Sequence, residues 1–300
     1  MKIMKFGGTS VGSGERMLHI GQIVKMFSEG QDVVVVVSAM NGVTDRLISL
    51  FQKYKSGNFP TALKEIRSLY SKHHRALKDL GLRKEDYIHV SKSLYHLFGD
   101  LTIYLSLCKK YDLLSYDYVI SFGEKLSSHL LSAAMNKIGV LAKPMDASSI
   151  IVANNEFSNA KAILTNTKIK AKKTLLPLLS EHIVPVVTGF FAATKGGEIV
   201  TLGRGGSDYS ATVLANALDA DEVVLWKEVD GVFSSDPQKN DKARFYPELT
   251  YSEALALAKN GAKVLHPEAM KPVQSKEIVV WVKNTFKPDF IGTKIWKGAL

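Results

Sequence analysis

Two glycine-rich segments carry residues that could bind phosphate and carboxylate groups. In KFGGTSV (5–11), Lys5 ends a predicted strand and two glycines let the chain turn with its N–H groups exposed, an arrangement that can cradle phosphate oxygens. In GRGGSD (203–208), Arg204 could hold a carboxylate with two parallel hydrogen bonds, and Asp208 could hold a lysine or a metal ion in place. The first segment matches neither the Walker pattern nor G-x-G-x-x-G, which disfavours a P-loop NTPase or a Rossmann dehydrogenase.

Three further segments are weaker when each is taken alone. SFGEK (121–125) puts Glu124 at the start of a predicted helix, where capping alone would explain it. WKEVDGVFSSDP (226–237) is a strand end that runs into turns, and nucleotides bind at the carboxyl ends of strands in open α/β sheets. In NGAKVLHP (260–267), Lys263 could reach a phosphate, whereas His266 before a proline is better explained as structural.

The elements that must position these segments alternate along most of the chain. Apolar, β-branched runs predict strands at residues 3–6, 32–37, 183–188, 222–226 and 278–282. Helical patterning covers residues 14–28, 125–136, 159–179, 211–218 and 252–260, and a wholly helical stretch at about 43–110. This alternation predicts one doubly wound α/β unit. Within it we expect an N-terminal lobe for the phosphate acceptor (about 1–190) and a C-terminal lobe for the nucleotide (about 191–300).

Length and composition exclude several classes of protein. The 300 residues are 46% hydrophobic and 23% charged, which fills a large core and argues against disorder. Apolar runs such as 33–37 are far shorter than the ~20 residues of a membrane-spanning helix. The N-terminus lacks a secretory signal pattern, so we expect a cytoplasmic protein with no membrane partner. The single cysteine, Cys108, excludes an internal disulfide and has no neighbouring Cys or His at metal-ligand spacing.

The formal net charge of +10 suggests an anionic partner, such as nucleotide phosphates, nucleic acid or an acidic membrane surface. Many of the lysines are scattered or clustered on segments of helical pattern, as at 109–110 and 168–173, with no aromatic residues between them. This distribution favours a solvated basic face over a nucleic-acid site.

Taken together, five segments of the sequence resemble the aspartokinase family. KFGGTSV, SFGEK, GRGGSD, VDGVFSSDP (229–237) and GAKVLHP (261–267) stand in the family's order and at its spacing, from Met1 to about Ile295. The resemblance implies a three-layer αβα sandwich around a mainly parallel sheet. It also implies transfer of the γ-phosphoryl group of ATP to the β-carboxylate of L-aspartate, the first step toward lysine, threonine and methionine. Mg²⁺ is expected on the nucleotide phosphates and not at a metal site of the protein, and a homodimer is expected by analogy.

The resemblance implies roles residue by residue. The implied catalytic residues are Lys5, which would neutralise the transferred phosphoryl group, Asp208, which would position a lysine, and Lys263. The implied aspartate pocket comprises Ser38, Thr44, Glu124, Arg204 and Ser207, with Glu124 on the α-ammonium and Arg204 on the α-carboxylate. The implied nucleotide contacts are Lys5, Gly7, Gly8, Ser10, Lys227, Glu228, Phe233, Gln238 and Lys263.

The chain departs from the family pattern on the nucleotide side. Many members have Thr-Asp in place of Lys227-Glu228, a tyrosine at Phe233 and an arginine at Gln238. Members usually continue past residues 292–295 into ACT regulatory domains, whereas this sequence stops at Leu300, so no ACT domain is expected in it. The alternatives are a non-catalytic sensor of an amino acid or nucleotide, a kinase of another small carboxylate, and a nucleic-acid-binding protein.

Overall fold

A mainly parallel sheet forms the centre of the molecule. The computed structural model describes residues 1–235, 240, 242–259 and 265–298. Its eight-stranded sheet has the order β10-β12-β11-β7-β1-β2-β4-β3. The strands are β1 (Lys2–Phe6), β2 (Val33–Val37), β3 (Ala142–Met145), β4 (Val184–Thr188), β7 (Glu222–Lys227), β10 (Glu248–Thr250), β11 (Val279–Asn284) and β12 (Thr293–Trp296). Neighbouring strands pair in parallel except β11 and β12, which are antiparallel.

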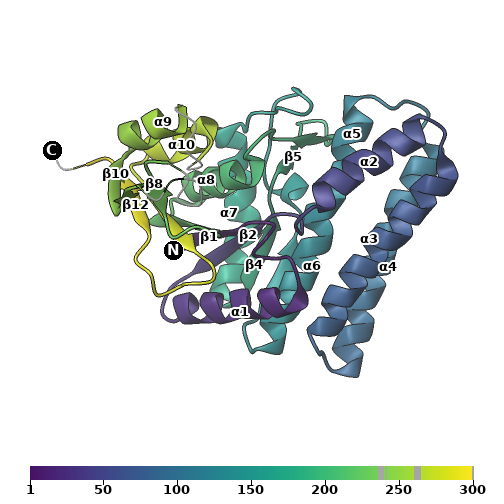
Figure 1. Cartoon of the computed structure of the whole chain (residues 1–300), viewed down its shortest axis with the longest axis horizontal. Helices are drawn as coiled ribbons and strands as arrows, with labels where there is room; N and C mark the ends of the chain where they lie inside the picture. Colours follow the sequence, from purple (N-terminus) through teal and green to yellow (C-terminus); the bar gives the residue numbers. More distant parts are fainter. Residues whose placement is uncertain (236–239, 241, 260–264, 299–300) are drawn as a thin grey trace.

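Helices cover both faces of this sheet (Figure 1). One face packs against α1 (Gly14–Ser28), α6 (Phe122–Lys137) and the helices beyond them, and the other against α7 (Leu164–Ser180), α8 (Gly206–Leu218), α9 (Tyr251–Lys259) and α10 (Pro267–Gln274). Because successive side chains of a strand point to opposite faces, Met4 and Phe6 of β1 join one hydrophobic core and Ile3 joins the other. The predicted three-layer αβα sandwich is confirmed.

The stretch predicted to be helical holds α2 (Val43–Lys55), α3 (Phe59–Asp79) and α4 (Lys84–Leu107), followed by α5 (Leu113–Ile120). Figure 1 shows α3 and α4 side by side at the end of the molecule opposite the C-terminus. No helix in the described part of the chain is both long and apolar enough to cross a membrane.

Short elements link the main strands to the loops. They are β5 (Phe191–Ala193) paired with β6 (Ile199–Thr201), β8 (Val232–Phe233) paired with β9 (Phe245–Tyr246), and a 3-10 turn at Ala147–Ser149. The sequence pattern did not predict these elements, nor the edge strands β3 and β10 and their short neighbour β12, because strands of two to four residues carry too little periodicity.

The starts of α7 and α8 differ most from the sequence prediction. The helix predicted from residue 159 begins at Leu164, because the residues before it form bridges, Val152 with Ala193 and Ala153 with Ala162. The helix predicted from residue 211 begins at Gly206, which brings Asp208 into its first turn. Strands from both halves of the chain form one continuous sheet. Within the described part of the chain, the sheet therefore has no boundary that would separate two lobes, and the division into lobes stays a prediction.

Candidate active site

Two lysines on neighbouring strands converge on one carboxylate. Lys5 of β1 lies in register with Leu225 of β7, and Lys227 follows two residues later on β7, so all three side chains point to the same face of the sheet. That face packs against α8, whose first turn carries Asp208. Lys5 Nζ lies 2.6 Å from Asp208 Oδ1, and Lys227 Nζ donates to Asp208 Oδ2 at 3.1 Å. The early start of α8 is therefore what forms this charge cluster.

The cluster keeps Asp208 ionised although it is buried. Burial by itself would raise the pKa of Asp208, but the positive charges of Lys227 and Lys5 outweigh it and hold the pKa well below its ordinary value. Lys5 is also buried, at 7% exposure. A buried carboxylate between two lysines fixes the position of Lys5, and it leaves the cluster with a net positive charge.

Lys5 and Asp208 line a pocket of about 360 Å³. It is formed by the loop after β1, the segment 38–45 after β2, the start of α6, and the glycine-rich segment 203–208. The predicted site residues that line it are Lys5, Gly8, Ser38, Thr44, Glu124, Arg204, Ser207 and Asp208. The structure thus brings the whole predicted aspartate pocket together around Lys5, although the roles of these residues stay predictions.

Glu124 is a buried acid among the residues that line this pocket. It lies in the first turn of α6 and is only 2% exposed. Its Oε1 accepts a hydrogen bond from the backbone N–H of Ala39 at 3.0 Å, and its Oε2 has no partner among the described residues. Burial raises the pKa of Glu124 to about 8, against the opposing effect of that hydrogen bond. The side chain is not a simple helix cap, and a cation in the pocket would restore its charge.

Close backbone approaches shape the two glycine-rich walls. A Cβ at Gly8 would lie 2.8 Å from the carbonyl oxygen of Ala39, so only glycine lets the loop after β1 approach the segment after β2. Gly205 precedes α8 with φ +74°, in the left-handed region, where a Cβ would also lie 2.8 Å from His266 Cβ. These contacts hold the segment with the exposed Arg204 at the mouth of the pocket.

Asp117 is a residue that the sequence reasoning missed. This carboxylate of α5 is fully buried and accepts four hydrogen bonds of 2.7 to 3.0 Å, two from Ser158 and two from Thr201. Thr201 ends β6 directly before the segment with Arg204. Asp117 therefore anchors the base of the glycine-rich segment. Its neighbours along the chain, Tyr116 and Tyr118, offer no signal for this role.

Other residues of the pocket were also missed. Met40, Asn41 and Asp45 line it from the segment that the sequence marks only as the end of a strand. Phe190 lines it as well, with a positive φ of 73° that is uncommon for a non-glycine residue. Its backbone N–H donates to Ser210 Oγ at 3.0 Å, which ties the loop after β4 to α8.

The predicted nucleotide contacts are spread over a wider region than the predicted aspartate pocket. Ser10 is buried, and its hydroxyl is hydrogen-bonded to Thr285 at 2.8 Å, so it does not face the pocket. Gly7 donates from its backbone to Trp226 O at 3.4 Å, while Glu228 is exposed beyond β7. Phe233 packs against Phe245, with ring centroids 5.4 Å apart. The predicted contacts Gln238 and Lys263 lie outside the described residues, as do parts of their segments.

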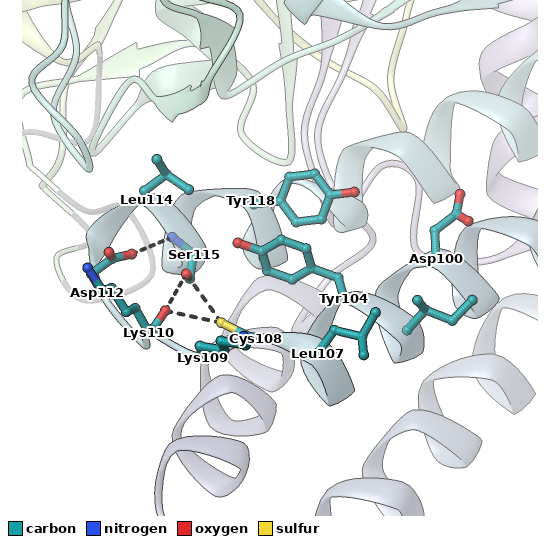
Figure 2. Close-up of a pocket in the computed structure, with 11 residues that line it drawn as sticks. Asp100, Tyr104, Leu107, Cys108, Lys109, Lys110, Asp112, Leu114, Ser115 and Tyr118 are labelled. Atoms are coloured by element: carbon teal, nitrogen blue, oxygen red, sulfur yellow. Dashed lines mark hydrogen bonds between the residues drawn. The ribbon is translucent and has the colours of Figure 1, made fainter.

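A larger hollow of about 600 Å³ lies elsewhere, between the end of α4 and α5 (Figure 2). Tyr104 and Tyr118 line it and pack against each other, with ring centroids 4.1 Å apart. Cys108 and Ser115 both donate to the carbonyl of Lys110. None of the predicted site residues lines this hollow. Within the described residues, no three His, Cys, Asp or Glu side chains gather as metal ligands do.

Comparison with known proteins gives a consistent result. Residues 1–284 match the amino acid kinase family. The chain is 36% identical over 299 residues to aspartokinase 1, chloroplastic, of Arabidopsis thaliana, covering 98% of this chain and 52% of that protein. It is 31% identical over 295 residues to the aspartokinase of Rickettsia prowazekii, covering 98% and 54%. The chain spans about half the length of these curated relatives.

A solved structure shares the arrangement of elements. The fold matches aspartokinase III of E. coli with a TM-score of 0.90 at 28% identity, covering 100% of this chain and 65% of that chain. The family match runs through every segment that forms the pocket, from Lys5 to Asp208. The chain therefore belongs to the amino acid kinase family.

Proposed function

We propose that the chain catalyses the aspartokinase reaction, the transfer of the γ-phosphoryl group of ATP to the β-carboxylate of L-aspartate. The observation that carries the proposal is the pocket itself, which combines a buried acid, an exposed arginine and a buried lysine in about 360 Å³. The relatives named above are aspartokinases, and the E. coli structure is of a complex with aspartate and ADP.

The acceptor would be held by charges at its two ends. Arg204 at the mouth of the pocket would bind the α-carboxylate with two parallel hydrogen bonds. The free Oε2 of Glu124 would accept from the α-ammonium. Ser38, Thr44 and Ser207 add hydroxyl groups to the same lining. A ligand fixed at these points would direct its β-carboxylate toward Lys5.

The chemical step requires that the negative charge of the transferred phosphoryl group be neutralised, and it does not require removal of a proton from the acceptor. The β-carboxylate has an ordinary pKa near ~3.9, so it is already an anion at neutral pH and needs no general base. One of its oxygens forms a bond to the γ-phosphorus while the bond from that phosphorus to the β–γ bridging oxygen breaks, releasing ADP and 4-phospho-L-aspartate. Lys5, held by Asp208 at 2.6 Å, would neutralise charge on the transferred phosphoryl group.

The nucleotide would bind toward β7 and β8, where Lys227 and Phe233 lie. Mg²⁺ would arrive on the nucleotide phosphates and reduce their negative charge. Both oxygens of Asp208 are engaged by lysines, so this acid is poorly suited to hold the ion. Lys263 is proposed as a second cation for the phosphates, by resemblance alone.

An assay of acceptor-dependent ADP release tests the proposal. L-Aspartate is compared with L-glutamate, N-acetyl-L-glutamate and UMP in the presence of ATP and Mg²⁺, and hydroxylamine traps any acyl phosphate. The Lys5→Met variant, purified identically, measures any contaminating kinase. We expect hydroxamate with L-aspartate alone. Aspartate binding without turnover in a folded protein would instead favour a non-catalytic sensor, and turnover with another acceptor would favour a kinase of that carboxylate.

Further parts of the proposal rest on the relatives. The product would enter the aspartate-family pathway to lysine, threonine and methionine. The cytoplasmic location stays a prediction, and the Arabidopsis relative is named chloroplastic. A homodimer is proposed by analogy, and light scattering on the eluted peak of a sizing column would give the mass to compare with the 33.0 kDa of one chain.

A further inference from the structure

A second pocket lies directly behind the segment that lines the candidate active site. It also measures about 360 Å³. Its walls come from the start of α1, from α2 and from one side of α3, and Met40 lines both this pocket and the candidate active site. We call it the basic pocket, defined by Ser13, Arg46, Ser71, Lys72 and Arg75. The proposed reaction uses none of these five residues.

Three cationic side chains line the basic pocket, whereas Asp79 is the one acidic residue among the described residues of its lining. Arg46 binds Glu65 through Nε at 2.6 Å, which leaves other guanidinium N–H groups available. Arg75 is exposed and has no ion-pair partner among the described residues. Burial, and then the nearby charge of Arg46, lower the pKa of Lys72. The positive charges of Arg46, Lys72 and Arg75 therefore share one pocket and are only partly balanced by nearby carboxylates.

A helix start and the hydrogen-bond donors of the three cations suit an anion at this place. Ser13 caps α1, a helix of 15 residues, and the positive end of a helix dipole favours negative charge. Ser68 adds a hydroxyl group from α3, whereas the hydroxyl of Ser71 donates to the carbonyl of Arg67 at 2.9 Å. Two arginines can each present parallel N–H groups to a phosphate or carboxylate, and Lys72 adds a point charge.

We propose that the basic pocket binds a small molecule through a phosphate or carboxylate group, between Arg46, Lys72 and Arg75. The oxyanion would offset the repulsion between Lys72 and Arg46. The pocket volume of about 360 Å³ admits a ligand larger than the oxyanion itself. This binding is independent of the function proposed above.

The same pocket is connected to the candidate active site by a short chain of hydrogen bonds. Lys72 Nζ donates to the carbonyl of Asn41 at 2.9 Å, and the N–H of Asn41 donates to the carbonyl of Gly8 at 3.0 Å. Lys72 therefore holds the segment between the two pockets against the loop after β1. An anion beside Lys72 would hold this side chain in place through an ion pair, so its binding is expected to stabilise the segment 38–42.

Calorimetric titration tests the site with orthophosphate and, separately, malonate. The Lys5→Met background removes the phosphate-binding lysine of the candidate active site. We expect saturable binding that persists in Lys5→Met and weakens about tenfold when Arg75→Gln is added, since one charge-assisted contact is lost. Arg67→Gln is the matched control, because Arg67 is exposed on the same helix but does not line the pocket.

The two probes distinguish the ligand class. Tighter binding of orthophosphate would indicate a phosphate-bearing ligand, and tighter binding of malonate a carboxylate. Binding of neither probe to the Lys5→Met protein, or equal weakening by Arg67→Gln and Arg75→Gln, would overturn the proposal.

Amide hydrogen exchange tests the connection without an activity measurement. The tighter-binding probe should slow exchange in the peptide that covers residues 38–44 in the wild type. It should not do so in Lys72→Met, which lacks the bond to Asn41. Slowing of equal size in both proteins would show that the segment responds by another route and would refute the proposed connection.

Discussion

The candidate active site and the hollow between α4 and α5 are two cavities that differ in how their polar residues are brought together. The hollow is larger, about 600 against 360 Å³. Its polar contacts are local, however, as Asp112 caps α5 and Ser115 donates to Lys110. The candidate active site instead gathers Lys5, Glu124 and Asp208 from three elements far apart in the sequence. We therefore identify the candidate active site by its buried charged side chains, which come from distant parts of the chain, and not by the volume of its pocket.

The largest effect is expected from Lys5→Met. Removing the cation nearest to the transferred group should lower kcat for L-aspartate phosphorylation by about 10²–10³-fold, with a much smaller change in KM. Lys227→Met is the matched control, because it removes the other lysine on Asp208 and leaves the 2.6 Å pair with Lys5 intact. Steady-state kinetics of both variants decide the point. Equal losses would mean that Lys5 acts only through the net charge of the cluster.

Arg204→Gln should act on binding instead of turnover. Loss of a bidentate contact to the α-carboxylate is expected to raise the KM for L-aspartate by about 10–100-fold, with a smaller effect on kcat. Arg204 is exposed, so the variant should fold with an unchanged Tm. An unchanged KM would remove the arginine from the acceptor pocket.

Glu124→Gln should produce a pH-dependent gain in stability. In the free protein, burial raises the pKa of Glu124 from 4.5 to about 8. Between these values the native state holds a proton that the unfolded state releases, so the carboxyl makes the protein less stable as pH rises. Glutamine cannot ionise. The Tm of the variant should therefore exceed that of the wild type by an amount that grows up to about pH 8 and then levels off.

The same group predicts proton release on ligand binding. An ammonium beside Glu124 would favour its charged form, so L-aspartate should displace a proton at pH 7. Calorimetry in two buffers of different ionisation enthalpy measures the number of protons, and Glu124→Gln should abolish the release. Binding of L-aspartate to the wild type with no proton release would contradict the proposed contact with the α-ammonium.

The smallest effect is expected in the hollow of Figure 2. Cys108→Ser keeps a donor that can reach the carbonyl of Lys110, and kcat and KM should stay within about twofold of the wild type. A tenfold loss of kcat with an unchanged Tm would break the comparison above, because it would give the larger hollow a part in the reaction.

Much of the fold followed from local pattern. The run of five valines in β2 is apolar on both faces, and it predicted a strand buried between helix layers in a parallel sheet. The glycines after Lys5 predicted a turn at the end of a strand, and those around Arg204 predicted a loop before a helix. Short strands such as β12, and the start of α7 at Leu164, could not be predicted, because pairing with distant residues decides them.

The sequence by itself determined which residues could do chemistry, since charge, donor count and backbone freedom belong to each residue type. Only the tertiary structure decided what they face. Glu124 looked like a helix cap but is a buried lining residue of the pocket whose Oε2 has no partner among the described residues, and Ser10 is hydrogen-bonded to Thr285. Lys5 and Lys227 meet at Asp208 because β7 pairs with β1 while α8 packs on both. Those contacts join residues about 20 to 200 positions apart, a range over which local periodicity carries no information.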